Sequence, residues 1–354
     1  MISVVNINIQ IRKTPQLRGF LFVILLIFSA CITEPKQEVK LVGETMGTTY
    51  VVKYITDEEP PINNVAIKQL LNQINESVST YIKRSTISRI NVNNVTLAYA
   101  AELDTIFIEN FNLSKKIYKQ TKGAFNPSLM PLVNYWGFGY KEKSRTEVDS
   151  ALVDKMIKKC NLDYFKIEDN RLRKGYNEGE LDFSAIAKGY AVDEIGALLE
   201  SRKINNYMIE IGGEILAKGK NAADVYWAIA VDQPKIEGKR KNFKAIINLN
   251  NKAIATSGNY RNYREIGKEK YGHIIDPATG YPKQTDILSV SIIADNCASA
   301  DAFATACMVM GAQKAKDYIE LNLEIEGYLI YLDENGKEKS WKSDGIEIRE
   351  LGIN

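Results

Sequence analysis

The chain has 354 residues, 45% of them hydrophobic and 25% charged, which is the balance of an ordinary globular protein with one large domain or two closely packed ones. Its formal net charge is only +2 and its basic residues are scattered, so the composition argues against a nucleic-acid partner. The densest basic cluster, at 235–244, is expected to be a solvated loop.

The first 30 residues have the features of a secretory leader. Arg12, Lys13 and Arg18 precede an unbroken apolar run at 20–28, and small residues follow it. The run is too short to cross a bilayer, which takes about 20 apolar residues. A cleaved signal peptide is therefore favoured over a short uncleaved anchor.

A lipidation motif ends this leader. The segment Phe-Ser-Ala-Cys that finishes at Cys31 resembles a bacterial lipobox, with Phe28 in place of the usual leucine. The resemblance implies that Cys31 is lipidated and becomes the first residue of the mature protein. We therefore expect 1–30 to be removed, 31–40 to form a polar tether, and 41–354 to fold outside the cytoplasm at a membrane surface.

Hydrophobic periodicity predicts both helices and strands in the remaining chain. In chain order we expect a strand at 48–55, helices at 65–79 and 101–118, a structured loop at 123–140, a helix at 185–201, strands at 207–211, 226–231, 243–249, 252–256 and 288–293, a buried helix from about 298, and a strand at 326–332. Asn335-Gly336 after the last strand is a hairpin signal. Consecutive strands mixed with helices predict an α+β fold.

The stretch 182–190 places an acid and a hydroxyl where a helix is expected to begin. Asp182 and Ser184 precede the helix, and Lys188 lies about one turn into it. A helix N-terminus offers free N–H groups and a partial positive charge, which suit a phosphate, and a lysine adds a full charge. The alternative is an ordinary N-cap followed by a solvent-facing lysine.

The stretch 300–306 carries the second candidate site. Asp301 and Thr305 are four residues apart, so on a helix they share a face. The rest of this helix is apolar, and an ionised carboxylate there needs a partner. Mg²⁺ prefers oxygen ligands and would serve. The alternative is an aspartate hydrogen-bonded to backbone at a helix start.

The stretch 273–282 begins with His273, the only histidine of the chain, and this excludes a metal site built on two or three histidines of one chain. A lone histidine is more often structural than catalytic. This one precedes a turn rich in Pro and Gly, where binding loops are commonly built. Gly212-Gly213, after an expected strand, allows close approach of a backbone or a ligand.

Seven segments form an ordered pattern when they are taken together. They are 44–50, 123–127, 182–193, Gly212-Gly213, 256–260, 273–282 and 300–305. This pattern, which extends over 46–311, resembles the ApbE-type FAD:protein FMN transferase family. The departures are Asn126, where Asp is commoner, and Glu214, where Asp usually follows the glycines. The resemblance implies mixed, largely antiparallel sheets packed with helices, in a single large domain of two closely packed lobes.

The resemblance also implies roles for individual residues. The Mg²⁺ ligands would be the Asp301 carboxylate, the Thr305 hydroxyl and the main-chain carbonyls of Ala185 and Ala304. Because a carbonyl that binds metal does not serve an ideal helix, we expect the helix to be irregular or just beginning near Ala304. The FAD site would be lined by Met46, Tyr81, Ala124, Phe125, Asn126, Asp182, Lys188 and Ile275, with the Tyr81 ring suited to cover a flat ring system.

The implied reaction transfers FMN from FAD to a threonine hydroxyl of another protein and releases AMP. Mg²⁺ and Lys188 would neutralise charge, and His273 or Asp276 could act as the base. Mn²⁺ or Ca²⁺ would accept similar oxygen ligands. Two alternatives remain: a periplasmic pyrophosphatase that splits FAD into FMN and AMP, and a non-enzymatic FAD-binding lipoprotein.

The family resemblance further implies an acceptor among the flavoprotein subunits of membrane redox complexes, of the sodium-pumping or Rnf type. Such subunits face the periplasm. The lipid anchor expected at Cys31 would place the enzyme on the same face of the bacterial inner membrane.

Overall fold

The computed structural model describes residues 36–57, 59–92, 102–141, 147–234, 243–258, 263–266 and 269–351. The predicted signal peptide, Cys31 and most of the basic cluster at 235–244 lie outside these ranges. Within them, no helix is long and apolar enough to cross a membrane.

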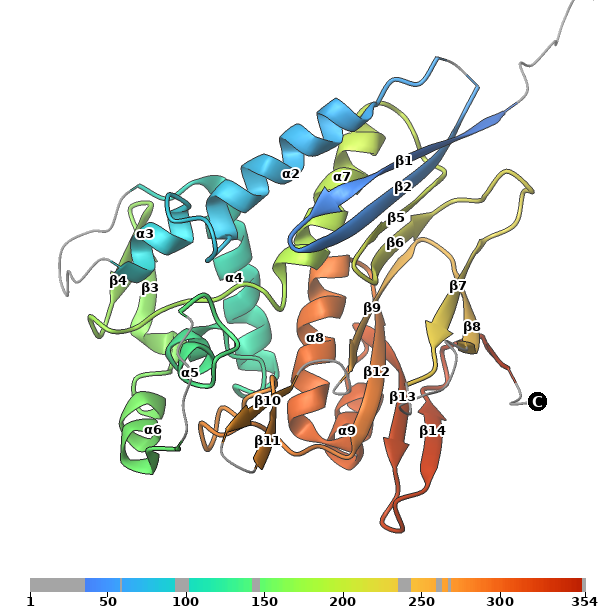
Figure 1. The fold of residues 1–354 in the computed structure, drawn as a ribbon. Coiled ribbons are helices and arrows are strands. Elements are labelled where there is room, and N and C mark those ends of the chain that lie inside the picture. The colour runs from blue at the N-terminus through green and yellow to red at the C-terminus, as the bar shows by residue number, and fades with distance from the viewer. Residues whose placement is uncertain are drawn as a thin grey trace, which may run out of the picture.

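An eight-stranded sheet runs through the centre of the molecule (Figure 1), and every neighbouring pair of its strands is antiparallel. This confirms the largely antiparallel α+β fold. In spatial order the strands are β1 (Gln37–Thr45), β2 (Thr48–Thr56), β5 (Tyr207–Ile211), β6 (Glu214–Lys218), β9 (Lys252–Gly258), β12 (Ile287–Ala294), β13 (Ile325–Leu332) and β14 (Glu338–Lys342).

Helices cover one face of this sheet and enclose the largest hydrophobic core. The helix α8 (Cys297–Met310) is buried on nearly all sides, as predicted, and α7 (Ala187–Ser201) packs directly on it. Gly189 permits this approach, because a Cβ atom there would lie 2.3 Å from the Cys297 carbonyl oxygen. The helices of this layer are α2 (Asn64–Val78), α3 (Thr86–Val92), α4 (Thr105–Gln120), α7 (Ala187–Ser201), α8 (Cys297–Met310) and α9 (Ala312–Leu321).

A three-stranded antiparallel sheet packs on the opposite face of the central sheet. Its order is β15 (Ile348–Glu350), β8 (Phe243–Leu249), β7 (Trp227–Asp232). A second apolar core lies between the two sheets, where Trp227 and Val231 meet Ile254, Ile293 and Ile330. The large sheet is therefore buried by helices on one face and by strands on part of the other.

Smaller elements pack into a third apolar cluster at the side of the helical layer. Part of the stretch 123–140, expected to be a loop, is helical, so that prediction was wrong there. Asn126 starts the helical turn by accepting a hydrogen bond from Ser128 N (3.0 Å), and Pro127 favours the first helical position. The elements of this cluster are η1 (Pro127–Leu129), α5 (Met130–Tyr135), α6 (Ser150–Ile157), β10 (Tyr263–Ile266) and β11 (Glu269–Gly272). Three further short elements, η2 (Leu162–Tyr164), β3 (Phe165–Glu168) and β4 (Arg171–Lys174), pack into the main core instead, through Leu162, Phe165 and Leu172.

The elements with strong periodicity match their predicted ranges. The strands β5 and β8 have the predicted bounds, and the other predicted strands agree within two residues at each end. The helix expected at 101–118 begins later, at Thr105, because the Asp104 side chain caps it by accepting from Phe107 N (2.9 Å). The hairpin predicted at Asn335-Gly336 joins β13 to β14.

Candidate active site

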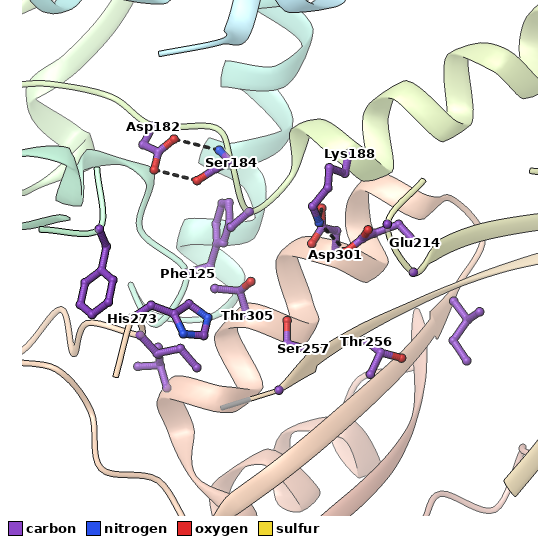
Figure 2. A pocket seen from close by; sticks show the side chains of 18 of the residues that line it. Phe125, Asp182, Ser184, Lys188, Glu214, Thr256, Ser257, His273, Asp301 and Thr305 are labelled. Carbon is purple, nitrogen blue, oxygen red and sulfur yellow. Dashed lines mark hydrogen bonds and ion pairs between the residues drawn. The ribbon is translucent and has the colours of Figure 1, made fainter. Parts of the chain in front are cut away.

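A cavity of about 1200 Å³ lies where α7 and α8 meet β5, β6 and β9. Segments far apart in the sequence converge on it, and most of the residues singled out from the sequence line its wall (Figure 2). The predicted residues that line it are Tyr81, Ala124, Phe125, Asn126, Asp182, Ala185, Lys188, His273, Ile275, Asp301 and Thr305.

Three charged side chains from three elements meet in this cavity (Figure 2). Lys188 of α7 forms an ion pair with Glu214, the first residue of β6, and its Nζ lies 3.8 Å from Asp301 Oδ2 of α8. Both carboxylates are only 4% exposed. The Lys188 side chain, itself 28% exposed, is held by these two carboxylates rather than standing free on the helix surface. It is the cation of a buried charge cluster.

Burial and mutual charge perturb the pKa values of these groups. Burial raises the pKa of Asp301, and nearby Lys188 opposes that rise. Burial and the charge of Asp301 raise the pKa of Glu214 to about 7. Burial by itself would lower the pKa of Lys188, but the negative charges of Asp301 and Glu214 have the larger effect, so the pKa is raised. Lys188 therefore stays protonated, and the cluster has one negative charge in excess when all three groups are ionised.

The donor atoms around this excess charge suit a hard cation. The Oε2 atom of Glu214 is buried and has no hydrogen-bond partner among the described residues. Asp301 and Thr305, one turn apart on α8, both line the cavity, and so does Ala185. Because the described ranges contain no group of three or more His, Cys, Asp or Glu side chains able to hold a metal, a cation here would need hydroxyl, carbonyl and ligand oxygens as well. This set fits Mg²⁺.

The segment before α7 forms a tight turn. The Asp182 carboxylate accepts hydrogen bonds from Ser184 N (3.0 Å) and Ser184 Oγ (2.7 Å), and burial raises its pKa. Neither residue caps the helix, because the N-cap position belongs to Ile186 and α7 begins at Ala187. Lys188 therefore lies at the second helical position, so the prediction that it stands one turn in was wrong.

His273 and Asp276 have different surroundings. His273 lines the cavity, and its ring lies edge-on to Phe138 with 6.3 Å between the centroids. Asp276 does not line the cavity. Its carboxylate accepts from Lys283 Nζ (3.0 Å) and Ala278 N (2.9 Å), which stabilises the following turn. Of the two, only His273 faces the space that a ligand would occupy.

Comparison with known proteins identifies the family. The profile of the ApbE family matches residues 46–329. The chain belongs to the ApbE family. It is 36% identical over 319 residues to the FAD:protein FMN transferase of Vibrio cholerae, covering 89% of this chain and 93% of the relative. It is 38% identical over 323 residues to the protein of the same name from Haemophilus influenzae, covering 88% and 91%.

Solved ApbE structures share the fold. The flavin transferase ApbE of Vibrio cholerae superposes with a TM-score of 0.77 at 35% identity, over 88% of this chain and 98% of that one. The apo form of the Pseudomonas stutzeri flavinyl transferase ApbE gives a TM-score of 0.77 at 29% identity, over 87% and 95%.

Besides Asp276, two residues assigned from the ApbE resemblance to FAD or metal binding do not line the cavity. Met46 lies in the turn between β1 and β2 and packs against the main core. Ala304 is fully buried inside α8, which runs unbroken from Cys297 to Met310. The prediction that this helix is irregular or just beginning near Ala304 was wrong, because caps from Asn296 and Asp193 start it two turns earlier. The carbonyl of Ala304 as a metal ligand stays a prediction.

Sequence reasoning missed Glu214 as a member of the ApbE site. It was noted only as a departure from the usual aspartate, yet it lines the cavity and pairs there with Lys188. The sequence does contain a signal for Glu214, because it is a charged residue directly after two glycines. Gly212 has a φ of +64° and Gly213 a φ of +108°, backbone angles that few other residue types adopt. The cavity is also lined by Ser184, Glu210, Thr256, Ser257 and Arg264.

Proposed function

We propose that this protein is an FAD:protein FMN transferase, which moves the FMN moiety of FAD to a threonine hydroxyl of an acceptor flavoprotein. The names of its relatives and their coverage of nearly the whole chain support the activity. The single observation that carries it in this chain is the buried cluster of Lys188, Glu214 and Asp301 in a cavity with the right residues for a pyrophosphate and a hard cation.

The proposed chemistry breaks one phosphoanhydride bond and forms one phosphoester bond. The threonine oxygen attacks the FMN-side phosphorus of FAD, and AMP leaves with the bridging oxygen. The proton of the threonine hydroxyl passes to a base. Catalysis of phosphoryl transfer consists mainly of positioning the reactants and neutralising charge. We therefore assign most of the catalytic effect to the fixed charges of the cavity.

Three groups of the chain have assigned tasks in this reaction. Lys188 stays protonated because of its two carboxylate neighbours, so it can offset negative charge on the pyrophosphate. Asp301 and Thr305, with the carbonyls of Ala185 and Ala304, would hold Mg²⁺, which when bound neutralises developing charge on phosphate oxygens. His273 lines the cavity and would take the threonine proton.

The cavity also suits a large planar substrate. Tyr81 is 71% exposed although it is a large aromatic residue, and it lies at the cavity wall, where its ring can cover the isoalloxazine ring. Phe125 is almost fully buried and forms a fixed apolar wall. These contacts would bind the flavin part of FAD, while the charged cluster binds the pyrophosphate.

We further propose that Cys31 carries a lipid that holds the enzyme on the periplasmic face of the inner membrane. The basic, apolar and small residues of the leader support this, although Cys31 lies outside the described ranges. The acceptor would be a periplasm-facing flavoprotein subunit of a sodium-pumping or Rnf-type complex. A Cys31→Ser variant that still incorporates labelled fatty acid and stays in the membrane fraction would contradict the anchor.

The function is tested by the intact mass of an acceptor flavoprotein after incubation with the enzyme, FAD and Mg²⁺. A mass gain equal to FMN minus water, absent with EDTA or with Asp301→Ala, supports transfer. Conversion of FAD into FMN and AMP with no modified acceptor supports the pyrophosphatase. Bound but unchanged FAD supports a non-enzymatic flavin-binding protein.

A further inference from the structure

The strand β7 is an open edge that forms one wall of the cavity. Residues 228–232 all line the cavity. The strand pairs with β8 on one side, and none of the strands in the described ranges pairs with its other side. An edge strand presents unpaired backbone N–H and C=O groups, which are a template for another strand.

This edge lacks the charged residues that usually prevent strand addition. The sequence of β7 is Trp-Ala-Ile-Ala-Val followed by its single charged residue, Asp232. The exposed side chains of Ala228 and Ala230 are too small to keep another strand away. The other outer strands of the two larger sheets carry Glu38, Lys40 and Glu44 in β1, Glu338, Lys339 and Lys342 in β14, and Arg349 and Glu350 in β15.

The edge is also held rigidly in place. Trp227 and Val231 are buried in the core between the two sheets, and Trp227 Nε1 donates a hydrogen bond to the Lys218 carbonyl (3.1 Å). A partner strand would therefore meet a preorganised surface and would lose less free energy to ordering.

The groove beside β7 is a second arm of the cavity. Figure 2 shows Asp182 and His273 on one side of Thr305, and Glu214 and Thr256 on the other. Asp182, assigned to FAD, lies on the first side, whereas Met208, Glu210 and Ile215 of the central sheet, none of them assigned to FAD, line the cavity together with β7. The total volume of about 1200 Å³ exceeds the range of about 300–1000 Å³ usual for a single small ligand. The second arm leads to the Lys188 cluster, and apart from Lys188 none of the residues named for this arm is assigned to FAD.

We propose that this second arm binds the threonine-bearing segment of the acceptor protein as a strand added along the free edge of β7. The inference rests on the proposed function, since a transferase must hold a polypeptide beside FAD. Backbone hydrogen bonds to β7 would fix the segment, and alternate side chains would enter the groove over Met208 and Ile215. The threonine would then attack the FMN-side phosphorus from the side opposite to the bridging oxygen that leaves with AMP, as in-line displacement requires.

The first test adds a charge to the edge of the full-length enzyme. Ala228→Lys and Ala230→Lys change exposed alanines to which no FAD or metal role is assigned, and Ala151→Lys, at an exposed alanine of α6, is the matched control. We expect each β7 variant to lower kcat/KM for the acceptor about tenfold or more, the effect of losing one or two hydrogen bonds. The loss should lie in the KM for the acceptor, with FAD affinity and melting temperature unchanged.

The second test needs no substitution in the enzyme. Hydrogen exchange of the enzyme with FAD is measured with and without an acceptor whose target threonine is replaced by alanine. Slower exchange of the amides at 228–231 supports strand addition, and unchanged exchange there overturns it.

The outcomes separate this inference from the function on which it rests. If the wild type transfers FMN and both lysine variants transfer it equally well, the docking proposal fails and the function stands. If the variants lose FAD affinity along with transfer, the arm belongs to FAD and the docking proposal again fails. If the wild type modifies no acceptor, the proposed function fails, and this inference fails with it.

Discussion

Asp193 of α7 accepts a hydrogen bond from the backbone N–H of Cys297, the first residue of α8, at 2.7 Å. A second bond comes from Ala298 N at 2.8 Å. One carboxylate thus caps a neighbouring helix and fixes the two helices that carry Lys188 and Asp301. This contact sets the spacing of the charge cluster, although Asp193 itself does not line the cavity.

We expect Asp193→Asn to lower both stability and transfer. An amide offers one oxygen where the carboxylate offers two, so one buried N–H loses its partner, at a cost of about 1–3 kcal/mol. The free energy of unfolding in urea and the kcat for transfer measure the two effects. Glu194→Gln, the next residue on α7, is the control and should change either value little. Equal stability of Asp193→Asn and wild type would contradict the capping role.

The stability difference between wild type and Asp193→Asn should depend on pH. Burial raises the pKa of Asp193 to about 7 in the folded protein, against the hydrogen bonds from Ala298 and Cys297. Between the unfolded pKa of about 4 and this value, the folded state binds more protons, so stability from this group falls as pH rises. The advantage of wild type over the variant should be larger at pH 5 than at pH 8. Urea titrations at the two pH values check the sign.

Replacing Lys188 should destabilise the fold by leaving buried carboxylates unpaired. Lys188→Met removes the cation between Glu214 and Asp301, and breaking a buried pair in this way costs about 3–5 kcal/mol. Adding Glu214→Gln should restore part of that loss, because it removes one unpaired charge. Transfer should stay low in both variants. Urea unfolding of the single and double variants forms the test, and additive losses would contradict the coupling.

Asp301 is expected to lower the stability of the metal-free protein and to raise its stability when Mg²⁺ binds. Without metal, Asp301→Asn should be at least as stable as wild type, because it removes a buried negative charge in excess. With Mg²⁺ at about 100 times its Kd, the wild type should gain about 2.7 kcal/mol and the variant nothing. Melting temperatures across an MgCl₂ series measure this. Asp295→Asn, an exposed aspartate in the turn before α8, serves as the control and should keep the Mg²⁺ response.

Substitution of the two candidate bases, His273 and Asp276, should lower kcat to different extents. His273→Gln should lower kcat for transfer by about 10² to 10⁴, the usual contribution of a general base. Asp276→Asn should lower it less, because that carboxylate stabilises a turn through Lys283 and Ala278. The FAD dissociation constant of each variant shows whether binding or chemistry is lost. A larger kcat loss for Asp276→Asn would reverse the assignment.

Much of this protein follows from local sequence. The strands β5 and β8 and the helices α2, α7 and α8 were predicted closely because each carries its own apolar pattern, which is independent of its neighbours. The strands β1 and β6 were not predicted. Charged residues interrupt the apolar pattern of β1, β6 has only three apolar residues between two charged ends, and the pairing partners of both strands decide their conformation. The candidate residues for binding phosphate and metal could also be identified from the sequence, because Lys188, Asp301 and Thr305 lie in short motifs.

The tertiary structure alone decided how these residues meet. Glu214 joins Lys188 and Asp301 only because β6, α7 and α8 converge, and no local pattern encodes a contact between such distant segments. The start of α8 depends on a carboxylate of α7, which is why it begins two turns before Ala304. The edge of β7 that no strand of the described ranges covers likewise exists only because the small sheet ends there. The sequence determined which groups are present, and packing between distant elements determined which of them share the cavity.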